Sequence, residues 1–94
     1  MFVRVVRFTD VAAERMDGLQ ARIESEGGPP PGVNAKGLQV IYDRDQGTAV
    51  VLQLFDSKED LDQGAAVFAA MDPSDTPGTR ASVDAGERVV DLSR

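Results

Sequence analysis

The sequence predicts an α+β domain of the split-βαβ, ferredoxin-like type, an antiparallel sheet with two helices on one face. Three observations support this. The chain has 94 residues, which suit one domain over residues 1–94. Apolar residues alternate in four short segments and recur at helical spacing in two others. The resulting order is β-α-β-β-α-β, without repeat or linker. Right-handed crossovers then place the first and third strands at the centre of the sheet.

The first predicted strand and helix occupy residues 2–26. Residues 2–8 (FVRVVRF) are β-branched and aromatic and alternate, as in a strand. Thr9 and Asp10 follow as candidate N-caps. Gly27-Gly28 predicts the helix end, because glycine readily takes the left-handed conformation of a C-cap. The predicted buried face of this helix recurs every three or four residues: Ala12, Met16, Leu19 and Ile23.

A glycine- and proline-rich loop and a hairpin come next. Residues 27–37 (GGPPPGVNAKG) hold four glycines and three prolines and cannot form a helix. Residues 38–43 (LQVIYD) and 48–55 (TAVVLQLF) are the second and third strands. Between them Arg44-Asp45-Gln46-Gly47 predicts a tight turn, with Gly47 supplying a positive φ.

The last third of the chain gives a helix and a strand. Ser57 is the expected N-cap, and the acidic residues after it face the positive helix end. This helix should end at Asp72-Pro73, and a turn-rich loop leads to an extended segment over residues 81–92 with a bulge at Gly86. The predicted buried face of the helix comprises Leu61, Ala65, Phe68 and Met71.

The composition excludes several chemistries. The chain has no Cys, His or Trp, which removes disulfides, thiol nucleophiles, imidazole bases and histidine-ligated haem or iron. We expect no metal and no cofactor. The net charge of −6 disfavours binding to nucleic acid or to anionic membranes. No window approaches the ~18 apolar residues of a membrane span, so we expect a soluble, cytoplasmic protein.

Each face of the predicted sheet carries apolar residues. In the third strand Val50, Leu52 and Leu54 point one way, while Ala49, Val51 and Phe55 point the other. Two helices cover only one face, and monomers rarely leave a large apolar patch exposed. We therefore expect a homodimer that forms through the open sheet face. The alternative is a monomer with scattered apolar surface residues.

The element order, the two-faced sheet and a late strand that reaches a partner resemble the dimeric α/β-barrel superfamily, which includes antibiotic-biosynthesis-monooxygenase-like proteins. The segments GPPPGV, DQGTAVVLQLF and TPGTRASVD are most similar to uncharacterised actinobacterial members. The resemblance implies a dimeric barrel but no shared catalytic site. Haem-degrading members use a histidine ligand, which this chain lacks.

Two functions follow from these observations. The first is a dimeric module that binds a small apolar or aromatic ligand, or a partner, without metal or haem. The alternative is a cofactor-independent monooxygenase-like or isomerase-like enzyme acting on a small aromatic, quinone or lactone substrate. In the enzyme Arg4 would hold a substrate anion, Tyr42 or an acid would transfer the proton, and Asn34 would orient the substrate.

Arg4 and Arg7 lie among apolar neighbours on a predicted central strand. One interpretation is an anion clamp, with Arg4 favoured because its face carries apolar bulk. The other is a structural ion pair with Glu87 or Asp91 of the last strand.

The remaining candidates have competing structural roles. Tyr42, the only tyrosine, is a possible proton-transfer group or a core residue whose hydroxyl reaches solvent. Asn34 and Lys36 lie in a loop that is either a lid or a connector. Phe68 is a candidate ligand contact on the second helix.

The acidic residues do not predict a metal site. Asp43, Asp45 and Gly47 resemble the start of a calcium loop, but its twelfth position is Leu54. The acids at 59, 60 and 62 are explained by the helix start.

Overall fold

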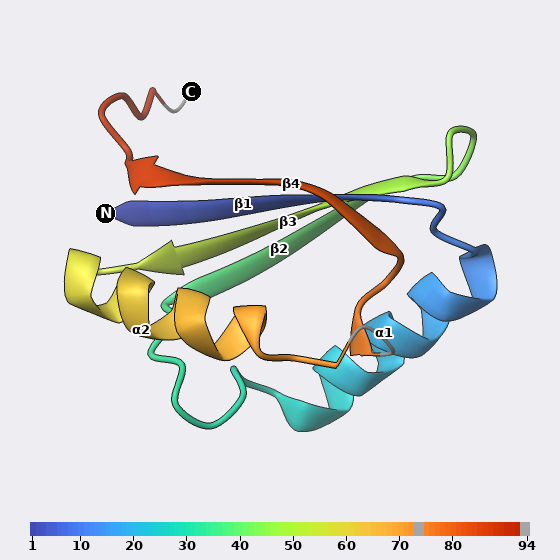
Figure 1. Cartoon of the computed structure of the whole chain (residues 1–94), viewed down its shortest axis with the longest axis horizontal. Helices are drawn as coiled ribbons and strands as arrows, with labels where there is room; N and C mark the ends of the chain where they lie inside the picture. The colour runs from blue at the N-terminus through green and yellow to red at the C-terminus, as the bar shows by residue number, and fades with distance from the viewer. Residues whose placement is uncertain (73–74, 93–94) are drawn as a thin grey trace.

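The computed structural model describes residues 1–72 and 75–92. The element order is β1 (Phe2–Thr9), α1 (Ala13–Glu26), β2 (Gly37–Asp43), β3 (Thr48–Phe55), α2 (Lys58–Ala69) and β4 (Thr79–Glu87). Both helices lie on one side of the sheet (Figure 1). The predicted α+β, ferredoxin-like arrangement is thus confirmed, as an open sheet and not a closed barrel within this chain.

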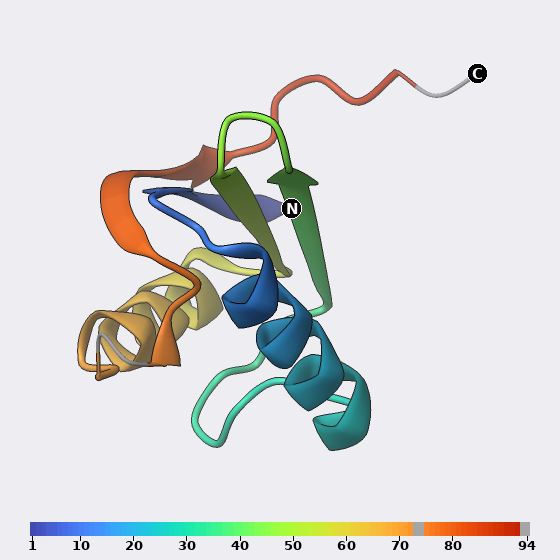
Figure 2. The ribbon, with the colours of Figure 1, turned by 90° about the vertical axis from the view of Figure 1, so that its right-hand side faces the viewer.

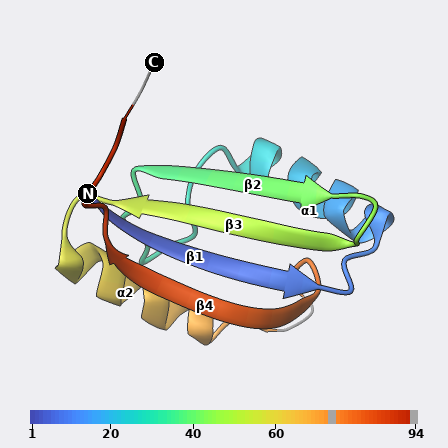
Figure 3. The ribbon, with the colours of Figure 1, turned by 90° about the horizontal axis from the view of Figure 1, so that it is seen from above.

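The sheet has the strand order β2-β3-β1-β4, with β3 and β1 at its centre as predicted (Figure 3). All three strand pairings are antiparallel. Arg4 lies opposite Gln53 of β3 on one side and opposite Ala85 of β4 on the other. Residues that lie opposite each other share a face, so this register decides which side chains meet beneath the helices.

Helix α1 ends where the glycines predict but begins later than its predicted caps. Gly27 takes the left-handed conformation at φ 67° and donates its N–H to the carbonyl of Ile23. Thr9 and Asp10 were the expected N-caps, yet the N-cap position belongs to Ala12, which has no capping side chain and is exposed. The prediction was wrong because β1 continues through Thr9 and a short connection follows it.

The connection from β1 to α1 is bound to the β2–β3 hairpin. Val11 donates its N–H to the carbonyl of Gly47 over 2.9 Å and accepts the hydroxyl of Tyr42 at its own carbonyl over 3.1 Å. Gly47 has a φ of 66°, as the turn prediction requires. The carboxylate of Asp43 accepts the backbone N–H of Gln46 and that of Asp45, which lowers the pKa of Asp43 below its ordinary value.

Helix α2 is capped as predicted: the Ser57 hydroxyl accepts the N–H of Asp60 over 3.1 Å. The helix ends at Ala69, earlier than the predicted Asp72-Pro73, and Pro73 lies outside the described residues. No helix in the described parts of the chain is long and apolar enough to cross a membrane.

The last strand is shorter than predicted. It spans Thr79–Glu87, and residues 88–92 continue outside it instead of extending the strand to 92. The register shift lies opposite the Arg7–Phe8 step of β1 and not at Gly86. Beyond the strand Val89, Val90 and Leu92 are among the most exposed large apolar side chains of the described residues.

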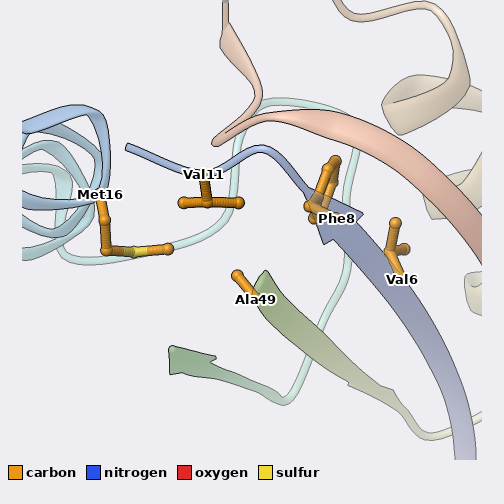
Figure 4. Packing of buried hydrophobic residues seen from close by; sticks show 5 residues of the cluster. All are labelled: Val6, Phe8, Val11, Met16 and Ala49. Carbon is orange, nitrogen blue, oxygen red and sulfur yellow. The ribbon is translucent and has the colours of Figure 1, made fainter. Parts of the chain in front are cut away.

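The buried core falls into two clusters. One lies under the β1–α1 connection and comprises Val6, Phe8, Val11, Met16 and Ala49 (Figure 4). The other, formed by Val33, Phe55 and Leu61, lies under α2. Arg4 and Gln53, both buried, stand between the two clusters on the central strands.

Helix α2 approaches the sheet at Gly64, and this contact generates a stability prediction. A Cβ atom at Gly64 would lie 2.8 Å from Cε1 of the fully buried Phe55 ring. We therefore expect Gly64→Ala to lower the free energy of unfolding by about 1–3 kcal/mol through overpacking. Gly18→Ala in α1 is the matched control, since a Cβ there meets nothing within 4 Å; helix propensity alone should raise its stability by about 0.5–1 kcal/mol. Urea denaturation measures the free energy of unfolding of both variants. Equal changes in the two variants would contradict the close packing of Gly64 against Phe55.

Candidate functional site

A cavity of about 610 Å³ lies between the sheet and the two helices. The helices diverge beneath the sheet, with the loop of residues 27–36 below them (Figure 2). Residues of β1, β2, β3, β4, α1 and α2 line the cavity, and residues 27–30, 35 and 36 of that loop contribute to its wall. The apolar lining includes Val6, Phe8, Leu19, Ile23, Leu38, Val40, Val51 and Met71. A volume of this size is typical of sites for small organic ligands.

Arg4 is the buried charge of this cavity. Its side chain is only 3% exposed, and its Nη1 donates to Oε1 of Gln53 over 3.0 Å. The Phe68 ring lies over the guanidinium, 5.4 Å from Cζ to the ring centroid. The Nε–H of Arg4 is buried and has no hydrogen-bond acceptor. A neutral amide and an aromatic face are therefore what the structure shows around this cation.

The expected ion pair between the arginines of β1 and the acids of the last strand does not form among the described residues. Glu87 lies opposite Phe2, and Asp91 pairs with Arg88 at 3.4 Å. The neighbour of Arg4 on β4 is Ala85, because the register places the acids elsewhere. Arg7 is exposed on the opposite face of the sheet.

A second arginine reaches the same cavity from β4. Arg80 lines the cavity, and its Nη2 donates to the carbonyl of Phe68 over 3.3 Å. Burial lowers the pKa of Arg4 from its ordinary value, and the positive charge of Arg80 lowers that pKa further. Both effects penalise the charged form of Arg4 in the absence of a counter-charge.

Two ion pairs border the cavity. Arg22 of α1 donates to Asp75 at 3.3 Å and to the carbonyl of that residue at 3.0 Å. Lys36 of the loop pairs with Asp56 at 3.4 Å. Both pairs are about half exposed, so they add little stability by themselves. The first pair nevertheless joins α1 to the segment that follows α2.

The structure brings together only some of the site residues predicted from sequence. Arg4, Phe68 and Lys36 line the cavity. Tyr42 lies outside the cavity lining, with its hydroxyl bound to Val11 and the Arg44 guanidinium over its ring. Asn34 also lies outside the lining, and its Nδ2 donates to Asp60 of α2 over 3.1 Å.

Sequence reasoning missed Gln53 and Arg80. Gln53 is a polar residue among the apolar residues on the helix-facing side of β3, so the sequence alone marks it as unusual. Its pairing with Arg4 depends on the register of β1 and β3, which the sequence does not show. Arg80 lies next to the irregular step of the β1–β4 ladder, which no local pattern predicts. Among residues 1–72 and 75–92, no group of three or more acids could hold a metal ion.

Comparison with known proteins supports the fold and no more. No family model matches the chain, and no curated protein matches it. Its structure is similar to the solved structure of Rv0793 from Mycobacterium tuberculosis, with a TM-score of 0.62 over 98% of each chain. Sequence identity is 16%, so this similarity shows a shared small α+β fold alone.

The Arg4–Gln53 pair generates a prediction on stability. Replacing both members of a buried polar pair by apolar residues of similar size often makes a protein more stable. Removing only one member destabilises the protein, because the other stays buried without its partner. We expect Gln53→Leu alone to destabilise the fold by about 2–4 kcal/mol, because it leaves the Arg4 charge without its amide. The double variant Arg4→Met/Gln53→Leu should be about 1–2 kcal/mol more stable than the wild type.

A double-mutant cycle from urea denaturation, with Arg4→Met as the other single variant, measures the coupling between the two side chains. Additive single effects would show that Arg4 and Gln53 do not depend on each other.

Proposed function

We propose that this chain is a dimeric module that binds a small, largely apolar or aromatic ligand in the cavity between the sheet and the helices. The observation that carries the proposal is the cavity itself: about 610 Å³, lined by apolar side chains with a few converging polar groups. Such a lining is the usual character of small-molecule sites. The buried but incompletely paired Arg4 adds support, since a merely structural arginine would have its donors satisfied.

The enzyme alternative has less support. It assigned Arg4, Tyr42 and Asn34 to one site, and only Arg4 lines the cavity. The Tyr42 hydroxyl donates to the Val11 carbonyl, so this hydroxyl joins β2 to the connection between β1 and α1. A ligand-binding role requires none of these proton-transfer groups.

The open face of the sheet supports the dimer. Pairing across β1, β3 and β2 places six apolar side chains on the face away from the helices: Val3, Val5, Ile41, Val50, Leu52 and Leu54. Ile41 is 58% exposed. The chain exposes 6127 Å² of surface, whereas the surface–mass relation gives about 5300 Å² for a monomer of 10.1 kDa. A second copy that packs sheet to sheet would cover this patch.

Ligand entry is tested by titrating isotope-labelled protein with 2-naphthol, a neutral aromatic probe. We expect amide shift changes for Val6, Val51 and Phe68, whose side chains line the cavity, and little change for Leu54 on the open face. Leu38→Trp should weaken binding, because a larger side chain on the edge strand occupies part of the cavity.

Gln63→Trp is the control, since Gln63 is exposed on α2 and lies outside both the cavity lining and the open sheet face. Shift changes confined to the open face, or no binding up to millimolar probe, would contradict the proposed ligand site.

The dimer is tested by light scattering at micromolar concentration, where we expect twice the chain mass of 10.1 kDa. Leu52→Glu should shift the mass to that of one chain, because a carboxylate would be buried without a partner in the interface. Ala66→Glu, at an exposed position on α2, should leave the dimer intact. A wild-type mass of one chain would overturn the dimer, and circular dichroism shows whether each variant is folded.

A further inference from the structure

We propose that the ligand is an organic anion, a small aromatic or aliphatic carboxylate, whose carboxylate is held by Arg4 and Arg80 while its apolar body fills the cavity. This inference rests on the proposed ligand-binding function and names the class of ligand. It is carried by the juxtaposition of two arginines in an apolar cavity, one of them buried with an N–H that has no acceptor.

The charge of the cavity wall is opposite to that of the chain. The whole chain has ten basic and sixteen acidic residues. Four basic side chains line the cavity in the described residues, against two acidic ones, Glu26 and Asp75. An acidic protein that gathers cations around an apolar space has a local potential suited to an anion.

Two of the four cations lack an acidic partner in the part of the chain that the structure describes. Arg22 and Lys36 are each paired with an aspartate, at 3.3 Å and 3.4 Å. Arg4 and Arg80 have no ion pair among the described residues, and their hydrogen bonds go to the neutral oxygens of Gln53 and Phe68. They are also close enough for the charge of Arg80 to lower the pKa of Arg4. A bound anion would relieve this repulsion as well as the cost of burying Arg4.

The chemistry of the surroundings selects a carboxylate with an apolar body. The guanidinium is planar and offers parallel N–H groups that match two carboxylate oxygens. Phe68 covers the Arg4 guanidinium, and Val6, Leu38 and Val51 provide apolar contacts beside it.

The experiment compares two isosteric probes, 2-naphthoate and its neutral amide 2-naphthamide, by calorimetry at pH 7 with the full chain. We expect naphthoate to bind the wild type at least about tenfold more tightly than naphthamide, because a hydrogen bond between charged groups changes affinity by about this factor. Arg4→Met should remove this preference, so that naphthoate and naphthamide bind with affinities within about twofold of each other. Arg80→Gln should reduce the preference in part, because Arg80 is exposed and hydrated.

Arg7→Met is the matched control, since Arg7 lies on the same strand as Arg4 but on the opposite face of the sheet. This variant should keep the full preference for naphthoate. If Arg4→Met does not fold, Arg4→Lys, which keeps the charge without the fork, and Arg80→Gln provide the measurement. Equal binding of the two probes to the wild type would overturn the anion site and leave the proposed ligand-binding function standing. A preference for naphthoate that survives in both the Arg4 and Arg80 variants would also overturn it. Failure of both probes to bind would overturn the proposed function itself.

Discussion

The hydrogen bond between Arg4 and Gln53 is the interaction around which the rest of the structure is arranged. It joins the two central strands at directly opposed positions and places a charge where a small α+β domain would ordinarily have an aliphatic residue. The apolar core is divided on either side of it into two clusters. A core of 94 residues is small to begin with, so this division removes apolar contact that the fold could otherwise use.

The cavity lies beside Arg4 and Gln53, where the apolar core is divided. Where a continuous core would draw both helices onto the sheet, α1 and α2 pack closely only near their own clusters, through Met16 and Gly64 respectively. The space between them is bordered by the proline-rich loop and by the Arg22–Asp75 pair. Residues that form a binding site commonly lower the stability of the domain that carries them.

The sequence predicted the arrangement of elements well because most of the evidence is local. Alternation in residues 2–8 and 48–55, the cap at Ser57 and the glycine at position 27 each act within a few residues and are present in the structure. The burial of Arg4 also follows from alternation. Its partner does not, since the pairing with Gln53 requires the register of two strands separated by a helix and a hairpin. The cavity lies between the sheet and two helices whose positions on that sheet are not encoded by periodicity.

Helix α1 is held near both of its ends, by the contacts of Val11 with the hairpin and by the Arg22–Asp75 pair. Two hydrogen bonds at Val11 and the buried Met16 hold the start of the helix against β2 and β3. Farther along, Leu19 and Ile23 are only half-buried and face the cavity. The pair at the far end is half exposed, so salt screens it more than it screens the buried contacts at Val11. The side of the cavity that α1 forms thus depends on one buried attachment and on one that solvent screens.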